Sequence, residues 1–330
     1  MPIVVRFHQL GGPENLKFED VPSQNPGKGE VRLRVQAVGL NRAESMFYRG
    51  QYLEQPHLPS HLGYEAAGVV EAVGEGVDTD WIGKSVATIP NFSMTSYGTL
   101  GEEAIVPATA LGEYPASLTA TQAAAIWMQY ITAYGALVHF GSVKAGDFVS
   151  ITAASSSVGL AAIQIVRDAG ATAIAVSRTE GKRAELLTLG AHHVIASEEE
   201  DYVARVQQVT SEMGVRLTFD PVAGPFVEKL ALAAAAGGMI IEYGALSLAP
   251  TPFPLFAAFR KGLTMRAYTL FEITGVPKLL ADAKKYVFDR LADGRFAPKI
   301  ARTFPFEQTV DAYRFLESNQ QVGKVVVTVP

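Results

Sequence analysis

A run of small residues at 153–159 joins an apolar segment to a segment with helical periodicity. After two alanines, the turn consists of Ser155, Ser156, Ser157, Val158 and Gly159. A helix N-terminus behind such a turn presents free backbone N–H groups, which bind the pyrophosphate of a dinucleotide. The usual G-x-G-x-x-G pattern reads here Ala154-x-Ser156-x-x-Gly159, and Ala and Ser are small enough for phosphate to approach the backbone. On its own the segment fits two interpretations, a cofactor turn and an ordinary α/β corner.

A second candidate site follows the apolar run 172–176, which reads as the next strand. In NAD-binding folds of this type, that strand ends in an acidic residue that binds the ribose hydroxyls. Here the strand end carries no carboxylate and is followed by Ser177 and Arg178, with Lys182 one helical turn later. Arg and Lys form charge-assisted hydrogen bonds with a phosphate. The pattern favours NADPH over NADH, and the competing interpretation is an ordinary solvated helix start.

Composition narrows the classes of function. The chain has 330 residues, a formal net charge of −5 and no cysteine. A negative chain has no basic field to attract nucleic acid or an anionic membrane, and no apolar run is long enough to span a bilayer. The lack of cysteine removes disulfides, thiolate catalysis and cysteine-ligated zinc. No secretory signal is visible at the start, so we expect a cytoplasmic protein that binds neither nucleic acid nor membrane.

The elements that must position these residues show two patterns of predicted secondary structure. Between 119 and 262 strand patterns alternate with helix patterns, including one expected helix over 123–138, which indicates a doubly wound parallel sheet. Residues 1–118 read as short strands separated by glycine bends, and 263–330 return to β patterns, including an expected strand over 265–270. We therefore expect one domain built from 1–118 and 263–330, with a nucleotide-binding domain over 119–262 inserted into it.

The order of several short motifs resembles the medium-chain dehydrogenase/reductase superfamily, in its zinc-free quinone oxidoreductase (zeta-crystallin-like) branch. These motifs span nearly the whole chain, and they are Gly63-Tyr64-Glu65, Gly68-Val69-Val70, Ile131-Thr132-Ala133-Tyr134, Ala145-Gly146-Asp147, the 153–159 turn, Leu189-Gly190-Ala191 and Gly323-Lys324-Val325-Val326. The resemblance implies an α/β fold with a GroES-like β-barrel catalytic domain and an inserted Rossmann domain. It also implies a nicotinamide site and a homodimer formed through an edge strand of the Rossmann sheet.

The chain departs from the zinc alcohol dehydrogenases of that superfamily. Those enzymes carry a cysteine near the start of the helix that begins here at Asn41, and a histidine where this chain has Tyr64. His57, His61 and Glu65 are the remaining metal-ligating side chains in the region, but the first two flank Pro59 in an expected loop, and no third ligand is spaced to join them. We therefore predict no metal site.

The resemblance also implies roles for individual residues. Asn41 matches an asparagine that orients the nicotinamide or the substrate oxygen, and Tyr52 matches a tyrosine near the substrate. Either Tyr52 or Tyr64 would donate a hydrogen bond or a proton. The alternatives are an N-cap for Asn41 and ordinary amphipathic residues for the two tyrosines.

Further cofactor contacts are expected at four positions. Thr132 resembles a threonine beside the nicotinamide, and its alternative is a helix residue that bonds back to a carbonyl. Val222, Gly244 and Ala245 follow expected strands, where a doubly wound sheet opens its ligand crevice; their alternative is a simple turn. Several aromatic residues, among them Phe253, Phe256 and Phe259, would line either a substrate pocket or the core.

These observations predict a metal-free, NADPH-dependent reductase. A quinone or an α,β-unsaturated carbonyl would accept hydride into an electron-poor π-system, and hydrogen-bond donors would stabilise the charge that develops on oxygen. The alternatives are a zinc-free reductase of simple carbonyl or enoyl substrates, and a low-turnover NADPH-binding protein with a structural or regulatory role. The segment 91–101 has no assigned role from the sequence.

Overall fold

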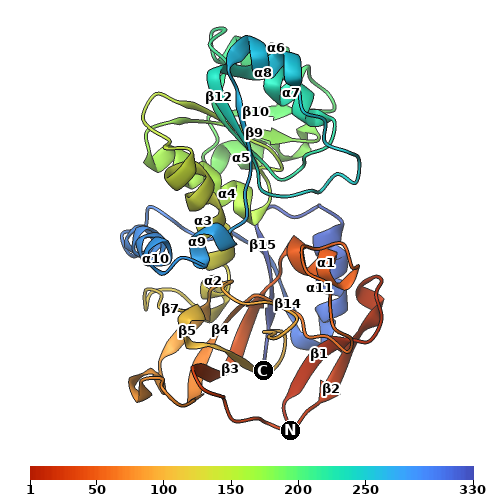
Figure 1. Ribbon diagram of the computed structural model, residues 1–330, viewed down its shortest axis with the longest axis vertical. Helices are drawn as coiled ribbons and strands as arrows, with labels where there is room; N and C mark the ends of the chain where they lie inside the picture. The colour runs from red at the N-terminus through yellow and green to blue at the C-terminus, as the bar shows by residue number, and fades with distance from the viewer. The chain divides into compact units, whose positions relative to one another are not determined.

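The computed structural model describes residues 1–330 and divides the chain into two compact units (Figure 1). The β-rich unit contains Met1–Met128 and Lys284–Pro330, and the parallel-sheet unit contains Gln129–Ala283. The boundaries that the sequence suggests, after residues 118 and 262, stay predictions. No helix has both the length and the apolar character needed to cross a membrane.

The β-rich unit is built on a seven-stranded sheet with the order β14-β15-β3-β4-β5-β7, in which β6 also pairs with β3. Its strands are β3 (Glu30–Gly39), β4 (Glu65–Val73), β5 (Ser85–Thr88), β6 (Glu103–Pro107), β7 (Leu111–Gly112), β14 (Ile300–Pro305) and β15 (Lys324–Thr328). A separate hairpin pairs β1 (Ile3–Phe7) with β2 (Leu16–Asp20). Strand β3 buries alternate residues, as its sequence predicts, and register shifts mark bulges where it pairs with β4.

Short helices complete this unit. They are α1 (Arg42–Tyr48), α2 (Ala120–Ala123) and α11 (Thr309–Glu317), while α3 (Trp127–Tyr134) and α10 (Pro277–Ala292) each contain a boundary between the two units. The short 3₁₀ turns of the whole chain are Pro13–Asn15, Thr79–Trp81, Ala108–Ala110, Glu180–Lys182 and Phe306–Gln308. Helix α1 begins directly after β3, and a capping box between Asn41 and Glu44 fixes its start.

The parallel-sheet unit holds six strands in the order β10-β9-β8-β11-β12-β13. They are β8 (Phe148–Ile151), β9 (Thr172–Ser177), β10 (His193–Ala196), β11 (Val215–Asp220), β12 (Ala234–Glu242) and β13 (Thr264–Ala267), and every pairing is parallel. The helices are α4 (Ser157–Asp168), α5 (Arg183–Thr188), α6 (Tyr202–Val209), α7 (Phe226–Ala233), α8 (Leu255–Lys261) and α9 (Phe271–Thr274). This is the doubly wound order, so the predicted fold class is confirmed.

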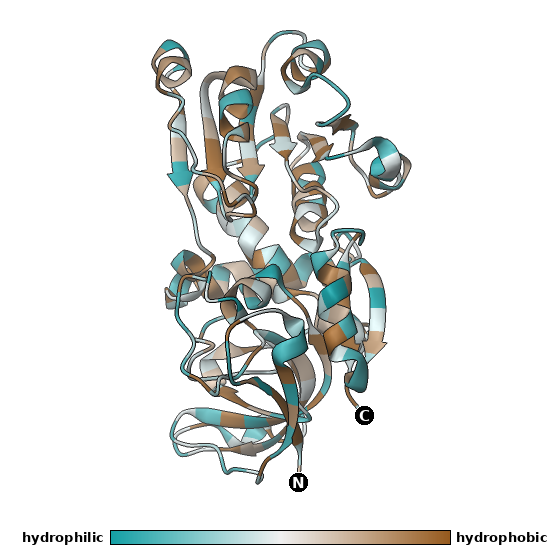
Figure 2. Ribbon diagram, turned by 90° about the vertical axis from the view of Figure 1, so that its right-hand side faces the viewer, coloured by the Kyte–Doolittle hydropathy of each residue, from teal (hydrophilic) through white to brown (hydrophobic).

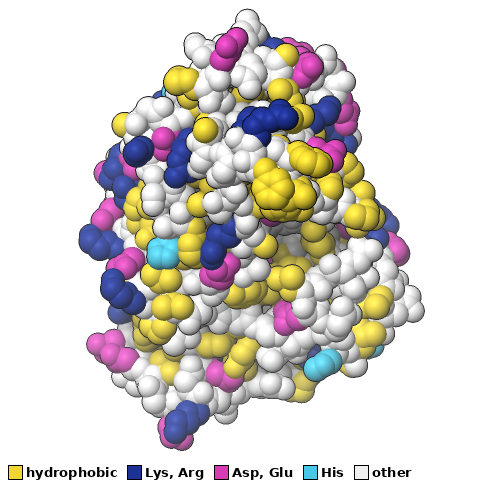
Figure 3. Space-filling view, turned by 45° about the horizontal axis from the view of Figure 1, so that its top comes forward, with side chains coloured by type: hydrophobic (Ala, Val, Ile, Leu, Met, Phe, Trp, Pro, Cys, Tyr) yellow, Lys and Arg dark blue, Asp and Glu magenta, His cyan; other side chains and the backbone are white.

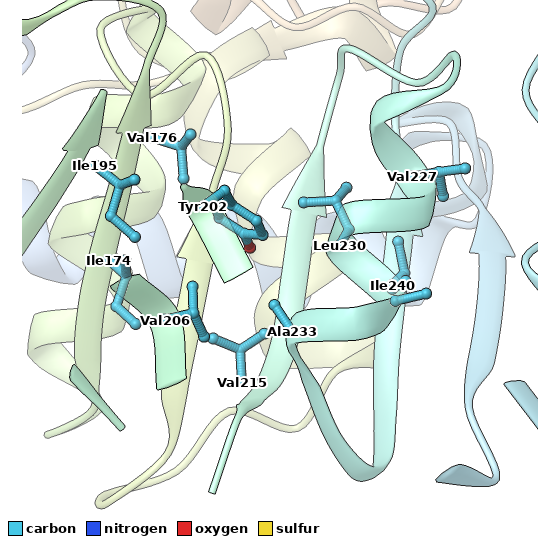
Figure 4. Packing of buried hydrophobic residues seen from close by; sticks show 11 residues of the cluster. Ile174, Val176, Ile195, Tyr202, Val206, Val215, Val227, Leu230, Ala233 and Ile240 are labelled. Atoms are coloured by element: carbon cyan, nitrogen blue, oxygen red, sulfur yellow. The ribbon is translucent and has the colours of Figure 1, made fainter. Parts of the chain in front are cut away.

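The core of this unit explains why its strands are so apolar. Figure 2 shows brown stretches in these strands, and a parallel sheet covered on both faces buries successive residues on each side. Figure 4 shows one part of the core, where side chains of β9, β10, β11 and β12 pack against α6 and α7. Tyr202 lies among them, and its hydroxyl meets the hydroxyl of Ser150 at 2.8 Å.

Two elements differ from the sequence expectation. The single helix expected over 123–138 is interrupted after Ala123, resumes at Trp127 and continues as a π-helical segment, Gly135–Phe140. A side chain at Gly135 would meet the hydroxyl of Tyr268 at 2.0 Å, so a distant tyrosine packs directly on this backbone. The strand expected over 265–270 ends at Ala267 and pairs in parallel with β12.

Candidate cofactor and proton-transfer sites

The turn at 153–159 lies at the carboxyl end of the central strand β8 and leads into α4. The Ser156 hydroxyl accepts a hydrogen bond from the N–H of Gly159 at 3.0 Å and caps the helix. A Cβ on Gly159 would approach the Ala154 backbone to within 2.6 Å, so only glycine permits this packing. Ala153 has a φ of 45°, a strained conformation for alanine that is concentrated at ligand-binding turns. Helix α4 therefore begins at a fixed turn, and its first N–H groups have no partner within the helix.

Two cations stand beside this turn. The Lys182 ammonium donates to the Ser155 hydroxyl at 3.0 Å, which joins the end of β9 to the turn after β8. Burial, and next the nearby charge of Arg178, lower the pKa of Lys182. The Ser177 hydroxyl donates to the carbonyl of Thr179 at 2.9 Å and shapes the loop that carries Arg178. Two repelling cations beside serine hydroxyls form a set that an anionic phosphate would stabilise.

The loops after β11 and β12 are bonded to each other. The N–H of Ser247 donates to the Val222 carbonyl at 2.9 Å, and a Cβ on Gly244 would meet the Pro221 carbonyl at 2.9 Å. Strand order reverses between β8 and β11, and the crevice at such a reversal is where doubly wound sheets bind ligands. The structure therefore places Val222, Gly244 and Ala245 at the same sheet edge as the serine turn. Thr132 is buried in α3, and its contact with a cofactor stays a prediction.

A pair of acidic residues, not identified from the sequence, lies at the ends of β11 and β12, and one of them holds the loop that follows β11. Asp220 and Glu242 occupy paired register positions on β11 and β12. Asp220 accepts hydrogen bonds from the N–H groups of Val222 at 3.1 Å and Ala223 at 2.8 Å, and also from the Thr152 hydroxyl. Burial, followed by the charge of Asp220, raises the pKa of Glu242 far above its ordinary range. A proton on Glu242 avoids a second negative charge beside Asp220 at this place in the sheet.

In the β-rich unit, Asn41 belongs to a buried polar cluster. Its amide nitrogen lies 3.1 Å from the Gly39 carbonyl, 3.2 Å from Glu44 Oε1 and 3.2 Å from Glu65 Oε2. Its amide oxygen accepts from the Lys324 ammonium at 2.6 Å, and the same ammonium pairs with Glu65. The amide is therefore held rigidly.

Lys324 and Glu44 are missing from the residues that the sequence suggested. Lys324 directly precedes the apolar run Val325–Val327. A lysine next to such a run could have indicated a buried ion pair, because lysine is rarely buried without a partner. Glu44 also accepts from the Tyr313 hydroxyl at 2.8 Å and from the N–H of Tyr64 at 3.1 Å. Glu44 is also the third helical residue, which completes the capping box with Asn41.

Tyr52 and Tyr64, both predicted as proton donors, lie together. Their ring centroids are 6.4 Å apart, and the ring planes are inclined at 61° to each other. The Tyr64 hydroxyl donates to Glu54 Oε1 at 3.3 Å. Burial raises the pKa of Tyr52 to about 12, and it raises the pKa of Tyr64 further. Both phenols are therefore protonated at neutral pH and can act as acids.

The chain is similar to known proteins over its whole length. It matches the family model of the alcohol dehydrogenase GroES-like domain over residues 27–135 and that of the zinc-binding dehydrogenase over residues 157–285. It is 30% identical to the human quinone oxidoreductase over 328 residues, which cover 98% of this chain and 96% of that protein. It is 29% identical to the 2-haloacrylate reductase of a Burkholderia species, over 99% of each protein.

A solved structure gives the same result. The Escherichia coli quinone oxidoreductase, whose structure is a complex with NADPH, superposes on this chain with a TM-score of 0.90. The two chains are 28% identical, and the match covers 99% of each.

Proposed function

Because this chain belongs to the medium-chain dehydrogenase/reductase superfamily, in its quinone oxidoreductase branch, we propose that it is an NADPH-dependent reductase of quinones or α,β-unsaturated carbonyls. The observation that carries the proposal is the contact between Lys182 and Ser155. This contact brings the expected 2′-phosphate site and the expected pyrophosphate turn together at the carboxyl ends of β8 and β9.

The residues at this edge fit NADPH. Ser155, Ser156 and Ser157, with the N–H of Val158 and the close backbone packing that Gly159 permits, would hold the pyrophosphate, while Ser177, Arg178 and Lys182 would hold the 2′-phosphate. Thr132, Val222, Gly244 and Ala245 would border the nicotinamide. Bound NADPH supplies a hydride from its nicotinamide ring.

The zinc implied by the name of one family model does not fit the residues present. The carboxylate of Glu65 is occupied by the Lys324 ammonium, and no group of three or more His, Cys, Asp or Glu side chains is arranged to hold a metal ion. An ammonium group in this place would repel a cation. We therefore assign no step to a metal.

The substrate class follows from the relatives and from the phenols. Two relatives are named for quinone and 2-haloacrylate reduction, and both acceptors contain a conjugated alkene that takes hydride at carbon. Negative charge then develops on oxygen, where the hydroxyls of Tyr52 and Tyr64 would donate hydrogen bonds or a proton. Asn41, fixed by Lys324, would orient the reacting groups.

The test is a comparison of cofactors and acceptors with the purified protein. NADPH oxidation is followed with 1,4-benzoquinone, 9,10-phenanthrenequinone and a simple enone, and cofactor binding is followed by fluorescence. We expect turnover with NADPH, weaker binding of NADH, and a loss of NADPH affinity of about tenfold or more in Arg178→Ala, since one charge-assisted hydrogen bond contributes about 1.5–3 kcal/mol. Arg205→Ala, which removes a cation paired with Glu200, is the matched control. NADPH binding without turnover of any acceptor would leave only a structural or regulatory role.

We further propose that the protein is a homodimer. Strand β13 is an edge strand of the parallel sheet, and the same unit exposes a group of large apolar side chains. They are Leu248 at 85%, Phe253 at 60%, Phe256 at 80% and Phe259 at 73% exposure. Figure 3 shows hydrophobic side chains gathered on an outer face of the chain. An edge strand beside exposed aromatics suits pairing with a second copy, because two equivalent patches would cover each other.

A further inference from the structure

We propose that Glu54 selects the acceptor by charge, so that the protein reduces uncharged quinones and conjugated carbonyls and discriminates against acceptors that carry a carboxylate. The inference rests on the proposed function, in which the Tyr52 hydroxyl meets the oxygen of the acceptor. It also gives the segment 91–101 a role, because this segment holds the Glu54 carboxylate in place.

Three hydrogen bonds fix the Glu54 carboxylate. The N–H of Met94 donates to Oε1 at 2.8 Å, the Tyr64 hydroxyl donates to the same oxygen at 3.3 Å, and the Ser93 hydroxyl donates to Oε2. Met94 is fully buried, so packing anchors its backbone donor. Residues 91–101 contain no charged side chain, and the segment therefore holds the carboxylate without neutralising it.

This carboxylate lies close to the phenol that is proposed to meet the acceptor. Tyr52 precedes Glu54 by two residues, and its ring packs on that of Tyr64 at a centroid distance of 6.4 Å. Tyr52 is partly exposed whereas Tyr64 is fully buried, so Tyr52 is the phenol that a ligand can reach. Burial, and after it the charges of Glu54 and Glu44, raise the pKa of Tyr52 to about 12. The charge of Glu54 therefore acts on the group that would bind the acceptor.

Glu44 adds a second negative charge next to Tyr64. It is fully buried and accepts hydrogen bonds from the N–H of Asn41 at 2.9 Å, the side-chain amide of Asn41 at 3.2 Å, the N–H of Tyr64 at 3.1 Å and the Tyr313 hydroxyl at 2.8 Å. Burial raises the pKa of Glu44, but these donors occupy all the acceptor positions of a carboxylate and leave none for a proton. Glu44 therefore stays ionised.

Cations that could offset these two charges are scarce in this part of the chain. Neither of the two carboxylates forms an ion pair, and the buried ammonium of Lys324 pairs with Glu65 instead. Residues 50–143 contain nine acidic residues and a single Lys or Arg, which is Lys84, and its ammonium lies over the ring of Trp81 at 4.9 Å. The carboxylate of an acceptor would normally be bound by such a cation.

The proposed reaction increases this difference between acceptors. Hydride addition leaves one negative charge on a neutral acceptor, and a phenol that donates a hydrogen bond or a proton stabilises it. An acceptor that already carries a carboxylate gains a second negative charge close to two fixed carboxylates. Because two charges interact several times more strongly near a protein surface than in bulk water, we expect Glu54 to lower kcat/KM for an anionic acceptor by about tenfold or more.

The experiment uses two acceptors that differ by one charge, 2-chloroacrylate and its methyl ester, with the wild type and Glu54→Gln. Glutamine keeps an oxygen that accepts from Met94 and Tyr64, so the substitution removes the charge and retains these contacts. We expect the ratio of kcat/KM for the anion to that for the ester to rise by about tenfold, while the values for the ester and for 1,4-benzoquinone stay within about twofold. The intrinsic reactivities of the acceptors cancel when the variant is compared with the wild type. The inference is overturned if Glu54→Gln reduces the anion no better than the wild type does.

Glu102→Gln is the matched control, because it removes one negative charge from the same unit. Glu102 accepts from the N–H of Ile3 at 2.8 Å and has no contact with either tyrosine. We expect its ratio of anion to ester to equal that of the wild type. A rise as large as that in Glu54→Gln would show that only the net charge of the protein matters, and the inference would be wrong.

A titration separates this inference from the proposed function. With 3-fluorotyrosine in place of Tyr52, the fluorine NMR signal follows the ionisation of that phenol alone. Removing a nearby negative charge stabilises the phenolate, so the label should ionise at lower pH in Glu54→Gln than in the protein that retains Glu54. A wild type that binds NADPH but reduces none of the three acceptors would refute the proposed function, and a lower midpoint would still support the charge at this site. Equal midpoints would overturn the inference in either case, since the charge of Glu54 would not act on Tyr52.

Discussion

Lys324 buries its ammonium group against Glu65 and Asn41, within a strand that is otherwise apolar. An unpaired buried charge costs several kcal/mol, and a hydrogen-bonded partner offsets most of this cost. The pair explains how the carboxyl group of Glu65 is stabilised in its buried position. It also explains why the amide of Asn41 has one defined orientation, since its oxygen faces the ammonium and its nitrogen faces carboxylates.

Removing the ammonium should therefore leave Glu65 uncompensated. We expect Lys324→Met to lower the free energy of unfolding by about 3–5 kcal/mol, measured by urea denaturation. The double variant Lys324→Met with Glu65→Gln should recover much of the loss, because it leaves no buried charge unpaired. Equal stability of the single and double variants would contradict this role of the pair.

At the scale of elements, residue patterns within a segment predicted the strands, turns and helices whose formation depends on neighbouring residues. The strand, turn and helix around 149–166 follow from β-branched residues, small turn residues and a serine cap, and the structure has each of them. The contact between Lys182 and Ser155 joins two loops 27 residues apart, and the Lys324–Glu65 pair spans 259 residues. Such pairings depend on strand order, which periodicity within a segment does not encode.

The same limit explains two further differences. Phe253, Phe256 and Phe259 recur at helical spacing and predicted a core or pocket stripe, yet all three are exposed. No part of the chain covers these side chains, and helical spacing alone does not indicate whether an apolar face has a neighbour to pack against. The helix expected over 123–138 becomes π-helical at Gly135, where Tyr268, which lies far along the chain, packs on the backbone.

The acidic pair on adjacent strands β11 and β12 makes stability depend on pH. In the folded chain Glu242 keeps its proton at pH values where an unfolded glutamate has lost it, because its pKa is raised. Folding stability therefore falls as the pH rises from the ordinary carboxyl range toward the raised pKa, by about 1.4 kcal/mol for each pH unit in that interval. Glu242→Gln removes this dependence.

We accordingly expect the stability advantage of Glu242→Gln over the wild type to be larger at pH 9 than at pH 6. Urea denaturation at both pH values measures it, with Glu228→Gln, on the neighbouring helix α7, as the control. A difference between variant and wild type that does not change with pH would show that Glu242 ionises normally.

At the scale of the whole molecule, the proposed dimer accounts for the exposed phenylalanines in the unit that has β13 as an edge strand. Replacing Phe256 and Phe259 by Asp should halve the mass measured by light scattering after size exclusion, because charges on both copies would repel and be buried without partners. The far-ultraviolet circular dichroism should stay the same, since both side chains are already exposed. A monomeric wild type would end the proposal.

An isotope label tests most directly whether the protein transfers a hydride from NADPH to an enone. The protein is mixed with NADPH that carries deuterium at C4 of the nicotinamide, on each face in turn, and with an enone, and the product is analysed by mass spectrometry and NMR. We predict a saturated carbonyl with one deuterium at its β-carbon, transferred from one face of the nicotinamide only. A product without deuterium, or bound NADPH that transfers none to any acceptor, would contradict the proposed hydride transfer.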